Sequence, residues 1–383
     1  MSTKKLYMIY FMTGVMGTIA IQMLPLVMNA KGYDASQVTL LLSIVFLASI
    51  FQPLIGYLTR TKVGTKSMLK TLAVVMTITA LIIFSITNYY FMIVIVLLFS
   101  IARLSISPIY DSYTTRAIET HNINYGLCRS GASFGFGIGM AIYTVIAAIF
   151  DLDYIAAFAL VAILALVATL IISSLPTDEN NQQSTADVTV EDKSNVLLVV
   201  LLIAMYTLYF GALNLRITYI STYYVEFGYT TSFISLTTFI MVIPEILFLP
   251  LYNRLFSNFN KVLLLFCSIV LGIIQIILYI MFTESPAMLM FASLFNGLQI
   301  MIFFPTYFGL LQQNLGKRNS AFGFVMNVTM MSLFVGIFNL FVIRPIYINS
   351  QSTISIFYLI IGLGICALIP LFIYHLKTKT NVH

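Results

Sequence analysis

The chain has 383 residues, of which 60% are hydrophobic and only 8% are charged, and its formal net charge is +6. Soluble domains carry about 25% charged residues, so the composition excludes a soluble fold and indicates a protein embedded in a lipid bilayer. The basic residues are gathered in short loops, which accounts for the positive charge without a nucleic-acid partner.

Apolar runs long enough to cross about 30 Å of hydrocarbon occur repeatedly along the chain. Backbone polar groups in lipid must be satisfied within the segment, so each run is predicted to be a helix. The expected fold class is an all-α membrane protein with twelve transmembrane helices. The predicted spans are 6–28, 35–57, 67–87, 90–113, 125–150, 154–175, 195–225, 231–252, 262–283, 287–313, 320–343 and 353–375.

The segment 32–40 returns, about half a chain later, as the segment 228–236. Each copy lies between the first and second span of its own half. A very apolar chain that is built twice is typical of a duplicated membrane transporter. The repeated residues are Gly32, Tyr33, Ser36 and Leu40, which recur as Gly228, Tyr229, Ser232 and Leu236.

One long hydrophilic stretch, 176–194, divides the two halves, and it is polar and acidic with no apolar periodicity. We therefore expect a six-helix bundle over 1–175, a cytoplasmic linker over 176–194 and a second six-helix bundle over 195–383. Basic residues favour the loops on one side of the membrane, so the positive-inside rule places both termini in the cytoplasm. The expected location is the cytoplasmic (inner) membrane of a bacterium.

Charges within spans are costly and are functional candidates by default. In the fourth and fifth spans these are Arg103, Asp111 and Arg129. We hypothesise that Asp111 and Arg129 pair and exchange partners with a proton or a polar substrate; the alternative is a structural lock. Arg103, near mid-membrane, suits an anchor for a polar or anionic substrate, and its alternative role is a cation held by helix carbonyls and hydroxyls.

Glu245 is the one carboxylate within the spans of the second half. Burial suits a carboxylate for carrying a proton, and Pro244 can loosen the helix beside it. The alternative is a conformational latch. Arg216, in the seventh span, is the nearest partner by residue type, although its expected depth differs from that of Glu245.

Uncharged polar side chains complete the predicted substrate cavity: Gln22, Asn214, Asn296 and Gln299. Each of them alone is equally explained by a hydrogen bond between helices. Gly131, Gly135 and Gly139 form a stripe with a spacing of four on the fifth span, which predicts the close approach of another helix.

The sequence contains no nucleophile elbow, phosphate loop, zinc motif or paired catalytic carboxylates, so we expect no enzyme and no cofactor. Cys128, Cys267 and Cys366 all lie in predicted spans and form no disulfide or metal pattern. The expected partners are a small-molecule substrate, protons and the lipid bilayer, and we expect a monomer.

The six-plus-six plan resembles the major facilitator superfamily over the whole chain. The loop from Gly56 to Lys66 is similar to that family's signature loop, although the family's aspartate is replaced by Thr59 or Arg60. The segments Pro108–Asp111 and Asn124–Gly135 resemble the oligosaccharide and nucleoside proton-symporter branch, which includes lactose permease. That resemblance implies that the acid and the arginine, eighteen residues apart, contact the substrate.

Other segments around Glu245 and Asn296 look similar to bacterial sugar-efflux transporters. We therefore expect a secondary transporter that moves a saccharide or another small polar solute with protons by alternating access. In this hypothesis Arg103, Asp111 and Arg129 bind the substrate, together with Arg216 and the amides, and Glu245 and Asp111 couple protons. The alternatives are a multidrug or metabolite efflux antiporter and a non-transporting receptor on the same fold.

Overall fold

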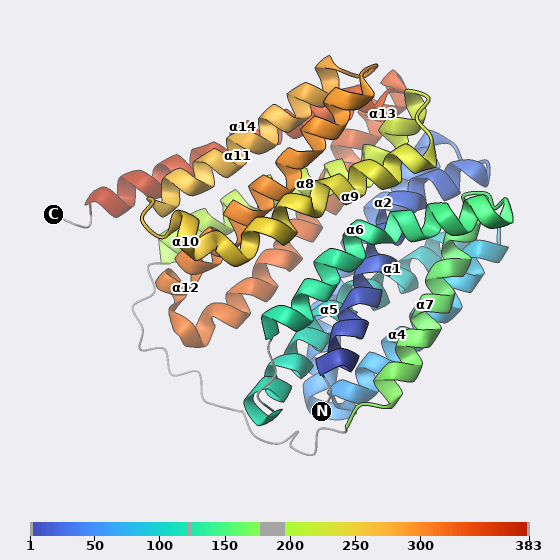
Figure 1. The fold of residues 1–383 in the computed structure, drawn as a ribbon, viewed down its shortest axis with the longest axis horizontal. Helices are drawn as coiled ribbons and strands as arrows, with labels where there is room; N and C mark the ends of the chain where they lie inside the picture. The colour runs from blue at the N-terminus through green and yellow to red at the C-terminus, as the bar shows by residue number, and fades with distance from the viewer. Residues whose placement is uncertain (1–2, 122–124, 177–195, 381–383) are drawn as a thin grey trace. The chain divides into compact units, whose positions relative to one another are not determined.

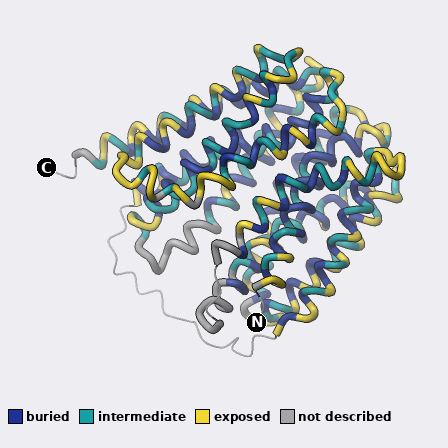
Figure 2. The backbone as a smooth tube through the Cα atoms, in the orientation of Figure 1, coloured by how far each residue is buried: buried dark blue, intermediate teal, exposed yellow. Residues whose placement is uncertain are grey.

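The computed structural model describes residues 3–121, 125–176 and 196–380 (Figure 1). All regular elements of this described part are helices, and twelve of them are long and apolar enough to cross a membrane, which confirms the predicted fold class. Along the long helices, buried positions alternate with exposed ones (Figure 2).

The first half of the chain contains α1 to α7 with two short irregular turns. Helix bounds are α1 Thr3–Ala30, α2 Ala35–Leu47, η1 Ala48–Phe51, α3 Gln52–Leu58, η2 Thr59–Val63, α4 Thr65–Ser85, α5 Tyr89–His121, α6 Tyr125–Phe150 and α7 Ala156–Ser173.

The second half contains α8 to α14. Its bounds are α8 Val196–Glu226, α9 Thr231–Phe248, η3 Leu249–Leu251, α10 Tyr252–Phe256, α11 Lys261–Met281, α12 Pro286–Phe338, η4 Asn339–Ile343, α13 Arg344–Ser350 and α14 Thr353–Thr380. α12 holds two of the candidate spans, Pro286–Leu315 and Met326–Ser350, the second of which continues through η4 and α13.

The chain forms two compact units, which we call unit 1 and unit 2. Unit 1 contains Met1–Asp187 and Gly336–Ile348, and unit 2 contains Val188–Val335 and Asn349–His383. Residues 336–348 join unit 1 because η4 packs against α2. The Asn339 amide, which is 0% exposed, donates to the Thr39 carbonyl and the Ser43 hydroxyl, both at 3.0 Å.

The repeated sequence segment has the same structure in both halves. Tyr33 donates its hydroxyl to the Thr87 carbonyl at 2.8 Å, and Tyr229 donates to the Thr283 carbonyl at 2.8 Å. Both partners of this bond are displaced by 196 residues (33 to 229, 87 to 283). The glycine before each tyrosine has positive φ, 82° at Gly32 and 77° at Gly228, which a residue with a Cβ rarely adopts. The repeated segment is therefore duplicated in its turn conformation as well as in its sequence.

The glycine stripe on α6 contacts α1, which runs beside it in unit 1 (Figure 1). A Cβ added at Gly131 would lie 2.8 Å from the Tyr7 carbonyl, and one added at Gly135 would overlap the Phe11 carbonyl. A Cβ added at Gly139 would overlap the Thr18 side chain and lie 3.0 Å from Val15, and both of these residues are on α1. The predicted close approach of another helix is confirmed, and the helix is α1.

Pro108 in α5 leaves one backbone carbonyl without its usual donor, because proline has no N–H to offer the residue four positions earlier. That residue is Leu104, and the Gln52 amide on α3 donates to its carbonyl at 3.0 Å. The bond fixes the level of α3 against α5 inside unit 1.

Candidate functional site

Arg216 on α8 is a buried cation, with 0% of its side chain exposed. Its guanidinium donates to the side-chain oxygens of Gln275 on α11 and Asn296 on α12. The titratable groups that act electrostatically on Arg216 are tyrosines, and no described carboxylate is among them. Neutral amide oxygens therefore stabilise the charge in place of an acid.

The amides around Arg216 are oriented by a second layer of hydrogen bonds. Gln299 donates its amide N–H to the Gln275 oxygen at 2.8 Å, and Tyr209 donates its hydroxyl to the Gln299 oxygen at 2.7 Å. Gln275 donates to the Tyr279 hydroxyl at 3.1 Å. The Gln275 oxygen thus accepts from both the guanidinium and Gln299, while the Gln275 nitrogen donates to Tyr279. We call Arg216, Gln275, Asn296, Gln299, Tyr209 and Tyr279 the Arg216 network.

The Arg216 network unites three residues that the sequence offered separately: Arg216, Asn296 and Gln299. It adds Gln275, which the sequence reasoning missed, although a lone amide in the apolar run of α11 was a usable signal. None of these four side chains is more than 2% exposed, so in this conformation they offer no surface to a solute.

The other two predicted amides each donate a hydrogen bond to the residue four positions earlier in their own helix. Gln22 on α1, which is buried, donates to the Thr18 hydroxyl at 3.2 Å. Asn214 on α8, half-buried, donates to the Phe210 carbonyl at 2.9 Å and approaches the Met331 sulfur at 3.6 Å. The structure does not bring either of them into the Arg216 network.

Asp111 on α5 is half-buried and accepts a hydrogen bond from the Tyr10 hydroxyl of α1 at 2.6 Å. Its predicted partner Arg129 lies on α6, but the Arg129 side chain falls outside the described residues. The pairing of Asp111 with Arg129 therefore stays a prediction. Tyr10 is a contact that the sequence reasoning did not identify.

Arg103 on α5 differs from Arg216 in its surroundings. It is half-buried, and among the described residues no hydrogen bond or ion pair joins it to another side chain or carbonyl. No described charged group lies close enough to act on it. A guanidinium carries five N–H donors, and none of them has a partner among the described residues.

Glu245 on α9 is half-buried and follows Pro244 within the helix. The backbone of α12 approaches it closely at Gly297, where an added Cβ would lie 2.7 Å from the Met241 carbonyl and 3.0 Å from the Glu245 amide nitrogen. Because Gly297 follows Asn296, the α12 turn that binds Arg216 also supports the backbone of α9 at Glu245.

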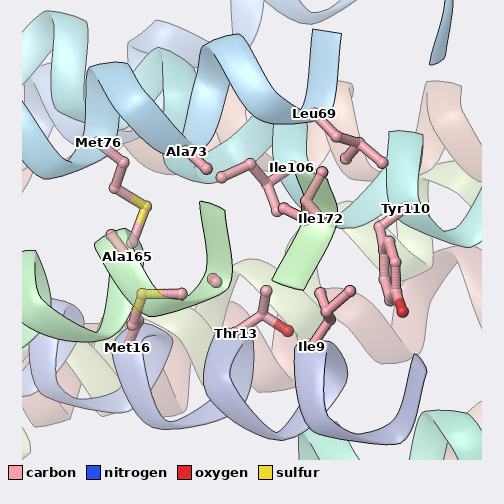
Figure 3. A pocket seen from close by; sticks show the side chains of 11 residues that line it. Ile9, Thr13, Met16, Leu69, Ala73, Met76, Ile106, Tyr110, Ala165 and Ile172 are labelled. Carbon is pink, nitrogen blue, oxygen red and sulfur yellow. The ribbon is translucent and has the colours of Figure 1, made fainter. Parts of the chain in front are cut away.

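A small cavity lies among α1, α4, α5 and α7 in unit 1 (Figure 3). Its room is about 10 Å³, enough for roughly one water molecule. The two hydroxyls on its wall, of Thr13 and Tyr110, already donate to the carbonyls of Tyr10 and Leu6 at 2.8 and 3.0 Å. We interpret it as a packing gap. In the described part of the chain, no group of three His, Cys, Asp or Glu side chains could hold a metal ion.

Comparisons with known proteins agree with this architecture. The model of the Major Facilitator Superfamily matches residues 6–339. The uncharacterized transporter YwbF of Bacillus subtilis (strain 168) is 26% identical over 359 residues, which cover 91% of this chain and 87% of YwbF.

Two solved structures share the fold. The nucleoside transporter NupG superposes with a TM-score of 0.77 at 17% identity, covering 99% of this chain and 100% of NupG. The D-xylose-proton symporter gives a TM-score of 0.70 at 15% identity, covering 96% of each chain.

Proposed function

Because this chain belongs to the major facilitator superfamily of transporters, we propose that it moves a small polar solute, a saccharide or a related metabolite, together with protons. The proposal rests mainly on one observation: each unit holds a half-buried carboxylate, Asp111 or Glu245, in one of its candidate membrane spans. A carboxylate in that position is costly unless it binds a proton or a polar partner.

In this proposal Asp111, Arg129 and Arg103 bind the solute, and Glu245 carries the proton, with Asp111 contributing to coupling. Tyr10 holds the Asp111 carboxylate in one orientation through its 2.6 Å hydrogen bond. We assign the Arg216 network to fixing α8, α11 and α12 together rather than to contact with the solute, because its members are enclosed. The expected setting is the cytoplasmic membrane of a bacterium, with both termini inside and the protein acting as a monomer.

Alternating access between two bundles of six spans is the transport mechanism that fits a duplicated chain. The proton symport of the D-xylose-proton symporter, which shares the fold, supports this choice of coupling. Protonation neutralises the carboxylate, which lowers the cost of moving it between environments of different polarity.

The alternative is an efflux antiporter for hydrophobic compounds, and one observation favours it. Aromatic rings cluster on α8 and α12: Tyr206 stacks on Phe210 at 5.0 Å, and Phe303 stacks on Tyr307 at 5.5 Å. Tyr206, Phe303 and Tyr307 are buried, so the half-buried Phe210 is the ring of this cluster that a solute could reach, and an aromatic face attracts cationic organic solutes.

Counterflow in liposomes tests the proposal, because it detects exchange of a labelled solute without needing a proton gradient. Saccharides, nucleosides and hydrophobic cations would be compared for wild type and Asp111→Asn. Asp151→Asn is a matched control, since Asp151 is exposed and its φ of 50° suits asparagine. We expect exchange of a saccharide that Asp111→Asn abolishes and the control retains. Exchange of hydrophobic cations alone would replace the proposal with the efflux alternative.

A further inference from the structure

Unit 1 contains three hydrogen-bond donors, centred on Arg103, that have no partner among the residues that the structure describes. Ser100 lies three residues before Arg103 on α5, which places the two side chains on the same face of the helix. The Ser100 side chain is 0% exposed, and its hydroxyl has no hydrogen-bond partner. A buried hydroxyl left without a partner is uncommon, because losing its hydrogen bonds to water costs free energy.

A third unpartnered group comes from the neighbouring element. The Ser49 hydroxyl on η1 is buried and has no hydrogen-bond partner. η1 packs against α5, and Gln52, three residues after Ser49, bonds the Leu104 carbonyl. The second and fourth spans of one bundle run parallel, so Ser49 lies level with the turn of α5 that holds Ser100 and Arg103.

A charge that faces hydrocarbon is far too costly, so we expect the accessible part of Arg103 to face a polar path rather than lipid. Arg103 also lacks an internal counter-charge. Asp111 is the one acid within the described spans of unit 1, and it lies eight residues further along α5, about 12 Å by helix rise. Asp111 is already bonded to Tyr10.

The positions of the second half that correspond to Arg103 and Ser100 carry different residues. The displacement of 196 residues relates Arg103 to Gln299 and Ser100 to Asn296. In unit 2 those two positions carry amides that are fully engaged with the Arg216 network. At these positions unit 1 therefore has a cation and a hydroxyl where unit 2 has amides that both accept and donate.

We propose that Arg103, Ser100 and Ser49 form a binding site for an oxyanion, so that the transported solute carries a carboxylate or a phosphate group. The oxyanion site narrows the substrate class of the proposed transporter, and the statement that the bound solute is also transported rests on the proposed function. A guanidinium pairs with two oxygens of a planar carboxylate or a phosphate in a bidentate arrangement, and the two hydroxyls supply further donors to the same group. Within the saccharide class the expected solutes are sugar acids or sugar phosphates.

Binding is tested by thermal unfolding of the purified protein in detergent at constant ionic strength. The probes are glucuronate and glucose 6-phosphate, with glucose as the neutral comparison, for wild type, Arg103→Gln and Ser100→Ala. Ser105→Ala is the matched control, because its hydroxyl is also buried without a partner on α5 but lies about 200° around the helix from Arg103.

We expect one of the two anions, and not glucose, to raise the unfolding temperature of wild type and of the Ser105 variant. The anion that acts identifies a carboxylate or a phosphate ligand. Arg103→Gln should weaken that affinity roughly 10- to 100-fold, and Ser100→Ala by about 3- to 10-fold. Equal shifts in wild type and Arg103→Gln would overturn the proposal, and so would a wild type that neither anion stabilises.

The unliganded Arg103→Gln protein should unfold at the same temperature as wild type or higher, because the substitution removes an uncompensated charge. A variant that fails to fold would show Arg103 to be a structural cation, which contradicts the proposal. Failure of this inference is separable from failure of the transport function. Counterflow of neutral sugars with no anion effect removes only the oxyanion site, whereas anion binding without any counterflow removes only the transport function.

Discussion

Replacing Gln275 with leucine tests whether neutral amides stabilise the buried charge of Arg216. Leucine has a similar size, so the substitution mainly removes polar groups. Gln275 accepts from the guanidinium and from the Gln299 amide, and it donates to the Tyr279 hydroxyl. All of these groups are buried, so water cannot replace the lost partners.

The expected cost follows from those lost contacts. A hydrogen bond to a charged group contributes about 1.5–3 kcal/mol, and a buried polar group left without a partner costs about 1–3 kcal/mol. We expect Gln275→Leu to lower the free energy of unfolding by about 3–5 kcal/mol, the range for breaking a buried charged pair. Arg216→Met should lower the free energy of unfolding by less than Gln275→Leu does. The Gln275 oxygen still accepts from Gln299 in this variant, so the Asn296 oxygen is the acceptor that loses its guanidinium donor.

The double variant gives the decisive comparison. Once Arg216 is replaced by methionine, Gln275→Leu no longer leaves a buried charge without its partner. The double variant should therefore lose at least about 1 kcal/mol less free energy of unfolding than the sum of the two single variants. Denaturant titration in mixed micelles measures each free energy of unfolding, and Gln312→Leu, an exposed glutamine on α12, is the control. Additive costs, or a Gln275→Leu variant as stable as the control, would refute the reasoning.

Three further perturbations have clear expected outcomes. Tyr33→Phe and Tyr229→Phe each remove one 2.8 Å hydrogen bond to a carbonyl, so each should lower the free energy of unfolding by about 1 kcal/mol, with equal effects in the same titration. Gly135→Ala should sharply reduce the yield of folded protein because its Cβ would overlap α1, whereas Gly17→Ala, with no atom within 4 Å of its Cβ, should be tolerated. Ala165→Val adds two methyl groups at the wall of the small cavity, so it should leave the unfolding temperature nearly unchanged or raise it slightly. A loss of more than about 1 kcal/mol in the free energy of unfolding would show that the cavity has no room for the added groups.

Hydropathy alone predicted the fold class, because twelve apolar runs separated by short loops have few alternatives in lipid. The repeated Gly–Tyr segment predicted the duplication, and both glycines adopt the positive φ that such a turn requires. The glycine stripe predicted a close helix contact but not its partner, since spacing on one helix says nothing about which helix approaches.

The sequence could identify polar residues within spans, but it could not place them relative to one another. Arg216 and Glu245 were compared as partners by residue type alone, whereas the structure bonds Arg216 to Gln275, on a helix that the reasoning had treated as purely apolar. Which residues meet depends on helix rotation within the bundle, and that is set by packing of the apolar faces. For Arg103 the sequence identified the residue as a candidate, but only the structure shows that no described residue bonds to it.

The central claim, proton-coupled transport, is tested most directly by solute-driven proton movement in liposomes that contain an internal pH dye. The comparison is wild type against Glu245→Gln, with Glu284→Gln, an exposed acid, as the control. We expect an inward solute gradient to change the internal pH with wild type and the control, and Glu245→Gln to retain solute exchange while losing the pH change. Solute movement without any pH change in wild type, or an undiminished pH change in Glu245→Gln, would contradict this account.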